Sequence, residues 1–453
     1  MGLSQCIDER CRWNLHSELA LRGMPSRICT LRGAFRICIE GYAFPNLYFG
    51  DLYFRVCALD LVPELCSIAG QKREVGMERS ALVYILLTVA AVVLGLWVDN
   101  RDYVAGYIRG GRAFGSPCGW DRQQARNMVS MTAVYCLMTG VSACRIAVGN
   151  DYWVYRDNFK LIAQGRYVSS EVGFNYIVKW MQELFGYDRY LPIFALFSII
   201  TVFFFVKALH DQGESFAFSL YLLMTGGFYF NSLNSVRYYL ALAIALYAMK
   251  YVLRGAYGKF TLCILAGALF HKSVLLVVPV YLAARFLAAV HLKKRHYAAG
   301  AVFIATLIFG QNFYREIIFY FYPYYRDSMF DSGELSYVNI MKCVGVLALG
   351  LICYRHGLKG NLQNRFYFFL NLFGLVTYCC GSFIPEVSRV GYYMIISQIF
   401  LIPGLLNGMK KDWFGRLCRA GAVSVFGIYF VFLLRGMYDV DVRLLPYLNW
   451  IFN

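Results

Sequence analysis

Charged side chains are scarce in this chain: they make up 16% of its 453 residues, whereas a soluble domain usually carries about a quarter. Hydrophobic residues account for 59%. By length alone, the chain would fold into about three soluble domains, but long apolar runs recur along it instead. The composition therefore argues against an ordinary soluble protein and predicts one polytopic helical membrane domain.

Acidic residues are the scarcer of the two charge classes, with 27 Asp and Glu against 44 Lys and Arg. The resulting net charge of +17 raises the question of nucleic-acid binding. The cations, however, lie mostly in short loops between apolar runs, where they set the orientation of membrane helices. We therefore expect no nucleic acid among the partners.

Several signatures of cofactor chemistry are missing. The chain has no HExxH motif, no pair of CxxC motifs and no GxxxxGK[ST] phosphate loop, so we expect no metal, no cofactor and no use of ATP. The 15 cysteines do not suggest a disulfide framework, because most of those after residue 130, such as Cys136, Cys263 and Cys379, lie within apolar runs. Cysteines in such positions are typical packing residues.

The first 76 residues differ from the rest of the chain. They hold six of the 15 cysteines and eight arginines against one lysine. They contain neither an apolar run long enough to span a membrane nor the ordered regions of a signal peptide. We expect residues 1–76 to be a wrongly assigned start, with the native chain beginning at Met77; the alternative is a small cytoplasmic or disordered extension. Residues 77–453 then form a single transmembrane domain.

Apolar runs follow one another from residue 80 to residue 436, and at roughly 20 residues per span they predict an all-α fold with about 12 transmembrane helices. Their limits are 80–98, 128–147, 190–209, 216–230, 236–254, 260–271, 273–290, 298–313, 336–354, 366–384, 388–407 and 420–436. The sixth run is short, so residues 260–290 are also compatible with a broken or re-entrant pair.

Basic residues predict the orientation of these spans. They gather in the loops that follow the first, fifth, seventh, ninth and eleventh runs, for example Lys250, Arg254 and Lys259. Loops rich in Lys and Arg are cytoplasmic in membrane proteins. The loops after the even-numbered runs therefore face outward.

A long outward loop, residues 148–189, follows the second run. Its second half has apolar residues at helical spacing: Phe174, Ile177, Val178, Met181 and Leu184. This spacing predicts an amphipathic helix that either lies on the membrane surface or packs on the bundle.

Basic groups from four separate parts of the sequence lie at or near the outward ends of spans: Arg145, Arg237, His271 with Lys272, and Arg389. Cations at such depths are costly in lipid and normally face a cavity or a partner. The arginine fork matches phosphate oxygens, so the set predicts a pocket for a lipid pyrophosphate headgroup. The alternative for each arginine is interfacial snorkelling, or an ion pair with an acid such as Asp151, Glu171 or Glu386.

Three residues are candidates for acid–base chemistry. Asp151 and Glu171 are the best placed acids, and His271 is open to the roles of general base, phosphate donor or core histidine. A glycosyl transfer that displaces a phosphate needs a base for the acceptor hydroxyl and charge stabilisation for the leaving group.

At these residues the sequence resembles the EpsG family of exopolysaccharide polymerases, which are Wzy-like integral membrane proteins. The matching pieces are spread over most of residues 77–453 and keep their order: Arg145-Ile-Ala-Val-Gly149-Asn-Asp151-Tyr152-Trp-Val-Tyr155, Glu171-Val-Gly173-Phe174, Asn234-Ser-Val-Arg237-Tyr-Tyr-Leu-Ala241, Phe270-His271-Lys-Ser273 and Ser388-Arg389-Val-Gly-Tyr392-Tyr393. The family often has glutamine at the position of Tyr238, which weakens a direct role for this residue but not for Arg237.

The resemblance implies polymerisation of undecaprenyl-pyrophosphate-linked repeat units into exopolysaccharide, capsule or O-antigen. The reaction would take place at the outer face of the bacterial plasma membrane, among its lipids, with a chain-length regulator and other glycan assembly proteins as partners. Carried over, His271, Asp151 or Glu171 would activate the acceptor hydroxyl. The pyrophosphates and sugars would be held by the remaining motif residues: Arg145, Arg237, Arg389, Lys272, Asn234, Tyr152 and Tyr155.

Other functions stay open at this point. A flippase for the same lipid-linked oligosaccharide would need charges along a path to both faces, and three lysines near other span ends keep that alternative open: Lys207, Lys250 and Lys342. We find no internal symmetry of the kind that repeat-built transporters show. A membrane ligase, an acyltransferase and a structural subunit of a glycan assembly complex are further alternatives.

Overall fold

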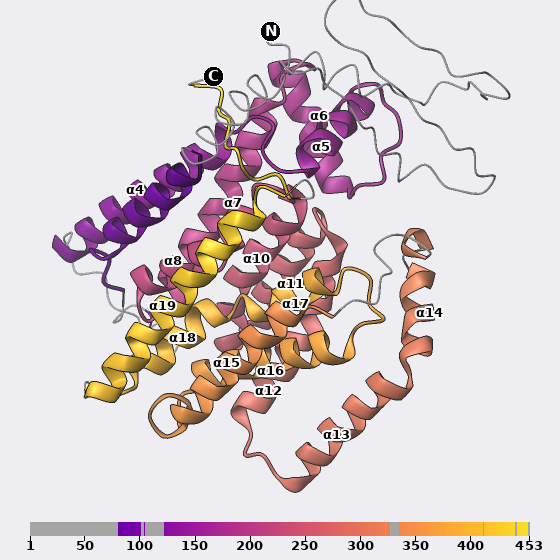
Figure 1. Cartoon of the computed structure of the whole chain (residues 1–453). Helices are drawn as coiled ribbons and strands as arrows, with labels where there is room; N and C mark the ends of the chain where they lie inside the picture. Colours follow the sequence, from indigo (N-terminus) through magenta and orange to yellow (C-terminus); the bar gives the residue numbers. More distant parts are fainter. Residues whose placement is uncertain are drawn as a thin grey trace, which may run out of the picture. The chain divides into compact units, whose positions relative to one another are not determined.

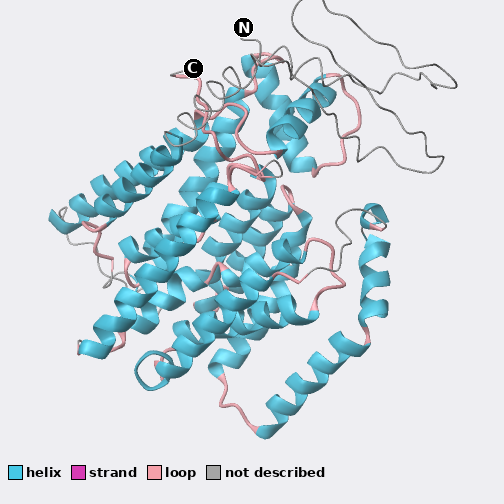
Figure 2. Cartoon of the chain, in the orientation of Figure 1, coloured by secondary structure: helices cyan, strands magenta, loops and turns pink. Residues whose placement is uncertain are grey.

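The computed structural model describes residues 80–100, 104, 122–321, 323–326, 335–410, 412–439 and 442–451. Residues 1–76 and Met77 lie outside this part of the chain, so the expectation about the start is untested. Within the described residues the regular elements are all helical. Their one β-type pairing is an isolated antiparallel bridge between Arg145 and Asn449. Figure 2 shows this all-α architecture, which confirms the all-α part of the predicted fold class.

Figure 1 labels the helices in chain order. After the helix Ser80–Gly95 they are α4 (Arg122–Ala143), α5 (Asp151–Ala163), α6 (Val172–Phe185), α7 (Leu191–Gln212), α8 (Phe216–Thr225), α9 (Phe228–Asn231), α10 (Val236–Leu253), α11 (Tyr257–Ala268), η1 (Lys272–Leu276), α12 (Val277–Ala289), α13 (Lys294–Phe309), α14 (Gln311–Phe321), η2 (Pro323–Tyr325), α15 (Tyr337–Ile352), η3 (Tyr354–Leu358), α16 (Leu362–Cys380), α17 (Val387–Ile395), α18 (Gln398–Asn407) and α19 (Trp413–Gly436).

Each of the 12 apolar runs coincides with one of these helices or with a consecutive pair, but fewer are long and apolar enough to cross a membrane alone. Among the described residues five helical stretches meet that condition: α7, α10, η1 with α12, α17 with α18, and α19. A sixth is α13 with α14, which are bent by 73° at their junction. The structure thus supports five or six spans, and the count of 12 stays a prediction.

The span predicted as broken is divided in the structure. Helix α11 ends at Ala268, and His271 is extended (φ −157°, ψ 109°) before η1 begins at Lys272. Residues 260–290 are therefore two helical segments with an irregular joint between them. This joint carries the Phe270-His271-Lys272 motif to the N-terminal end of η1.

Helix α10 occupies the centre of the bundle. Its sequence is apolar on every side, and a helix of that kind is buried by its neighbours. Almost every residue from Val236 to Leu253 is buried, and the helix contacts α7, α11, α12, α16 and α17. Small side chains, among them Ala241 and Ala245, allow close approach of these partners. Helix α10 therefore holds its first residues in a fixed position.

Helix α6 is the amphipathic helix predicted in the loop 148–189. Phe174, Val178 and Met181 are buried in a core shared with α5 and α7, which selects bundle packing for these residues. Leu184, which the same spacing included, is 57% exposed. The buried aromatic rings of this core fix α5 and α6 against the start of α7.

Candidate functional site

Arg237 and Glu171 form an ion pair at the start of α10. Arg237 Nη1 donates to Glu171 Oε2 at 2.6 Å, and the side chains are 23% and 12% exposed. Arg237 lies in the first turn of α10, where the positive end of the helix dipole disfavours a cation. Glu171 offsets this repulsion as well as the desolvation of the guanidinium.

Three helix N-termini converge on the Glu171 carboxylate. Glu171 is the residue directly before α6, Arg237 belongs to the first turn of α10, and the backbone amide of Lys272, the first residue of η1, donates to Glu171 Oε1 at 3.2 Å. Helix N-termini present free amides and a partial positive charge, and together they favour anions. The η1 terminus contributes its backbone amide to the carboxylate, and the α10 terminus contributes the Arg237 side chain.

His271 completes this group, which we call the Glu171 cluster (Glu171, Arg237, His271 and the Lys272 amide). His271 Nδ1 lies 3.5 Å from Glu171 Oε1 and has no hydrogen-bond partner among the described residues. Its ring stands edge-on to Tyr238, with centroids 5.5 Å apart. The imidazole is thus held in place by an aromatic ring and faces a carboxylate.

The Glu171 carboxyl is strongly acidic. Burial raises its pKa, but contact with His271 and the positive charge of Arg237 outweigh burial and bring the pKa to about 2. A carboxylate of such low pKa is a weak base at neutral pH. Glu171 therefore lies in the cluster, as predicted. As a carboxylate of low pKa it is better suited to binding Arg237 and His271 than to removing a proton.

Asp151 and Asn234 lie beside the cluster and join α5 to the loop before α10. The backbone amide of Asp151 donates to Asn234 Oδ1 at 2.9 Å, and Ser235 Oγ donates to Asp151 Oδ2 at 2.6 Å. Gly149 (φ +90°) makes the approach possible, because a Cβ there would lie 2.9 Å from Asn234 Cα. The two predicted residues are thus brought together by a tight backbone contact.

Tyr155 closes the other side of Arg237. Its hydroxyl accepts from the Arg237 backbone amide at 3.4 Å, and the guanidinium carbon lies 5.9 Å from the Tyr155 ring centroid and 5.3 Å from that of Phe174. Aromatic faces stabilise a cation that has left water. Tyr152 is turned elsewhere and stacks on Phe194 at 4.7 Å.

Arg389 reaches the cluster through its backbone. Its carbonyl accepts from the Tyr238 hydroxyl at 2.7 Å, while its Nε pairs with Glu386 Oε2 at 3.1 Å. The next turn of α17 is tied to η1 by a 3.1 Å hydrogen bond between the hydroxyls of Tyr393 and Ser273. Tyr238, which departs from the family pattern, therefore connects His271 to Arg389, a role that sequence reasoning missed.

Arg145 is separate from the Glu171 cluster. It is 1% exposed, and its Nη1 donates to the Ser142 carbonyl and, at 3.0 Å, to Ser198 Oγ. Its guanidinium carbon lies 5.1 Å from the Phe194 ring centroid. Within the described residues no carboxylate lies at ion-pair distance from Arg145 and its Nε has no hydrogen-bond partner, so no recorded contact joins this predicted residue to the other arginines.

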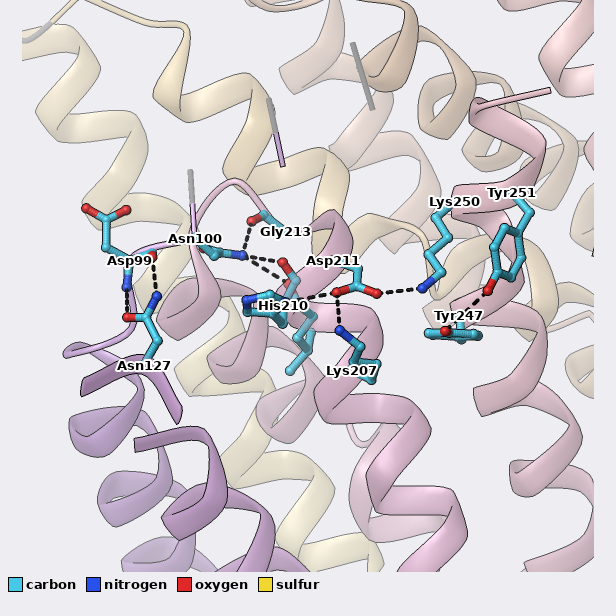
Figure 3. A network of polar contacts seen from close by, with 11 residues as sticks. Asp99, Asn100, Asn127, Lys207, His210, Asp211, Gly213, Tyr247, Lys250 and Tyr251 are labelled. Carbon is cyan, nitrogen blue, oxygen red and sulfur yellow. Dashed lines mark hydrogen bonds and ion pairs between the residues drawn. The ribbon is translucent and has the colours of Figure 1, made fainter. Parts of the chain in front are cut away.

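A second polar network lies at the far ends of α7 and α10, and sequence reasoning did not single out its central residue (Figure 3). Asp211 is buried and binds Lys207 Nζ at 2.8 Å, Lys250 Nζ at 2.5 Å and His210 Nδ1 at 2.8 Å. The i, i+4 pair of Lys207 and Asp211 inside an apolar run is the signal that was available. We call these residues the Asp211 network.

The three lysines that kept a transport path open have other partners. Lys207 and Lys250 belong to the Asp211 network, and Lys342 Nζ lies 3.8 Å from the Tyr429 ring centroid. Asn100 closes the same end of α7, since its Nδ2 donates to the carbonyls of His210 at 2.6 Å and Gly213 at 2.9 Å. The Asp211 network therefore ties α7 to α10, and Asn100 ties the segment after the helix Ser80–Gly95 to the end of α7.

Among the described residues there is no group of three or more His, Cys, Asp or Glu side chains that could hold a metal ion. The expectation from the sequence that the chain lacks an Asp-x-Asp motif is wrong, because it carries the triplet Asp439-Val440-Asp441. Its last two residues lie outside the described part of the chain.

The comparisons with known proteins bear on the whole of this arrangement. A model of the EpsG family matches residues 128–449, a range that contains every residue of the Glu171 cluster and of the Asp211 network. No curated protein and no solved structure was found to match the chain. With most of its length matched by that model, the chain belongs to the EpsG family, which suggests a polysaccharide polymerase-like membrane protein.

Proposed function

We propose that this protein polymerises lipid-linked oligosaccharide repeat units at the outer face of the bacterial plasma membrane. The growing glycan is transferred from its undecaprenyl pyrophosphate carrier to the sugar of an incoming unit. The observation that carries the proposal is the convergence of three helix N-termini with Arg237 and His271 on Glu171. Such an arrangement suits a substrate whose leaving group is an anion.

In the proposed reaction His271 is the base. Neutral His271 takes the proton of the acceptor hydroxyl, the acceptor oxygen forms a bond to the anomeric carbon of the growing chain, and the bond from that carbon to the pyrophosphate breaks. The departing electron pair stays on the pyrophosphate. Glu171, 3.5 Å from His271 Nδ1, stabilises the imidazolium that forms, as carboxylates do beside catalytic histidines. Asp151 is the alternative base.

The arginines serve the leaving group in this proposal. Arg237 and Arg389 are joined by a short path through Tyr238, and both guanidinium groups lie at the ends of helices that begin on the same side of the bundle. Planar donor forks bind phosphate oxygens in two-point contacts. Arg145, which is buried behind Ser198 and Phe194, is assigned a supporting position below the pocket rather than direct contact.

A flippase of the same substrate is the alternative that the structure favours least. Transport needs a path that opens toward both faces. At the inner end the charges of Lys207 and Lys250 are neutralised on Asp211, and Asn100 bonds to the backbone next to it. These polar side chains bind one another and the backbone, so they do not line an open path at that end of the bundle.

The test is glycan chain length in a deletion strain that carries the full-length chain, with membrane expression checked. The strain with Arg237→Ala should accumulate single lipid-linked repeat units on the outer face and make no polymer. The matched control is Arg166→Ala, which changes an exposed arginine of the same outward loop and should leave polymer length unchanged.

The alternatives predict other outcomes of the same experiment. Accumulation of repeat units on the inner face would identify a flippase. Normal polymer from Arg237→Ala would contradict the proposed pocket at its central residue. Extension of a labelled repeat unit by the purified protein in vitro separates a polymerase from a ligase, an acyltransferase and a structural subunit.

A further inference from the structure

Helix α6 has a second apolar side that the protein does not cover. Tyr176, Trp180 and Leu184 are 73%, 49% and 57% exposed. They are spaced four residues apart, so they form one strip along the helix. This strip is distinct from the buried side of Phe174, Val178 and Met181.

The circumference of α6 is divided into three sides. At about 100° per residue, the buried residues form one side, a polar row forms the second and the exposed strip forms the third. The polar row is Asn175, Lys179 and Glu183, of which the last two are exposed. A helix with one side on protein, one polar side and one aromatic side fits a position where protein, water and lipid meet.

Both ends of α6 are fixed to helices of the bundle, one of which is the candidate span α7. At its N-terminal end the Gly173 amide donates to the Leu269 carbonyl at 3.1 Å, directly after α11 ends. At its C-terminal end five residues separate Phe185 from Leu191, where the candidate span α7 begins. Figure 1 shows α6 beside α5 at the start of α7, so this helix lies next to the end of a candidate span.

We infer that the strip of Tyr176, Trp180 and Leu184 binds the lipid surface of the outer leaflet at the level of the headgroups. Tyr and Trp are the side chains that concentrate at this level of a bilayer. Helix α6 ends five residues before the candidate span α7, whose Ile199 and Phe203 are 42% and 50% exposed. The occupant is therefore lipid rather than a second protein.

This contact sets the depth of the Glu171 cluster. Glu171 directly precedes α6, so a helix held at the headgroup level also holds the carboxylate, and with it Arg237, at that level. An anionic lipid headgroup would meet these groups without leaving the interface. The inference concerns the position of α6 and holds whatever reaction the site performs.

The test is quenching of Trp180 fluorescence by brominated lipids. The full chain is reconstituted in nanodiscs whose phosphatidylcholine carries bromine near the headgroup end or near the methyl end of its acyl chains. The emission of Trp180 is obtained as the difference between wild type and Trp180→Phe. We expect bromine near the headgroup end to remove most of this emission, and bromine near the methyl end to remove less.

A matched variant controls for the orientation of the helix. Lys179→Trp in the Trp180→Phe background moves the indole by about 100° around α6 to its polar side, where brominated lipid should leave its emission unchanged. Equal quenching at positions 180 and 179 would overturn the proposed orientation. A Trp180 emission that neither lipid quenches would overturn the lipid contact. In that case a blue-shifted spectrum would indicate that a protein partner or a second copy covers Trp180, and a red-shifted spectrum would indicate that Trp180 is exposed to water.

Discussion

Gly173 leaves no room for a side chain against Leu269. A Cβ at Gly173 would lie 2.6 Å from Leu269 Cβ and 2.8 Å from the Leu269 carbonyl oxygen, which accepts the Gly173 amide proton. Backbone atoms cannot move aside as a flexible side chain does. Two sequence positions almost 100 residues apart thus fix the start of α6 on the end of α11, two residues from Glu171 and two from His271.

The first prediction concerns this contact. Gly173→Ala should push α6 away from α11 and displace Glu171 from His271, so polymer length should fall sharply while expression persists. Gly258→Ala in α11 is the control, because a Cβ there meets nothing within 4 Å and alanine favours the helix. Glycan chain length in the complemented strain measures both. Equal polymer from the two variants would show that the close approach has no part in activity.

The second prediction is a pH dependence of stability that comes from Glu171. Its pKa is about 2 in the folded protein against an ordinary value of 4.5. A lowered pKa gives stability that is fully present above the ordinary value and is lost as the pH falls through the folded value. The difference corresponds to about 3 kcal/mol.

Thermal unfolding in detergent measures whether stability falls with pH in this direction. Wild type should lose stability relative to Glu171→Gln as the pH falls from about 5 toward about 2, and the gap between the two proteins should be constant at higher pH. The comparison cancels the titration of the other acids. A gap that does not change below pH 5 would show that Glu171 is not held in its ionised form.

The third prediction concerns the Asp211 network. Asp211→Asn leaves Lys207 and Lys250 without the carboxylate that both of them bind, and removal of one partner of a buried ion pair costs about 3–5 kcal/mol. The melting temperature in detergent should therefore fall. The double variant Asp211→Asn with Lys250→Met should recover part of the loss, since it removes a buried charge as well. No recovery would mean that Lys250 does not depend on Asp211.

The fourth prediction separates a catalytic from a structural role of His271. His271→Gln should lower kcat for chain extension by about 10²–10⁴-fold, the usual contribution of a general base, with KM for the lipid-linked unit changed little. If Asp151 is the base instead, Asp151→Asn will show this loss and His271→Gln will not. A rise in KM without a fall in kcat would assign His271 to substrate binding.

Much of the architecture was predictable because it depends on local pattern. The apolar runs predicted helices at the right positions, including the division near His271, since the length and hydrophobicity of a run are properties of consecutive residues. The same reasoning did not establish which helices cross the membrane, because α4 and α16 carry polar residues along their length and α8 and α15 are short.

The sequence did not identify which acid pairs with which basic residue. Three acids were candidates to pair with the arginines at the span ends, and the tertiary structure pairs Glu171 with Arg237 and Glu386 with Arg389. Arg237 and Glu171 are 66 residues apart, and a pairing over that distance depends on how α6 and α10 pack. For the same reason, the separate burial of Arg145 and the central place of Asp211 followed from packing alone.

The sequence by itself determined an all-helical membrane protein of the EpsG family with its unusual cations at the helix ends. Hydrophobicity, charge and motif order are properties of consecutive residues and can be read without the structure. Only the tertiary structure decided that three helix N-termini meet at one carboxylate, and that α6 turns one apolar side to the bundle and another outward. Those relations join residues from distant segments, and their energies exist only once the helices are packed against one another.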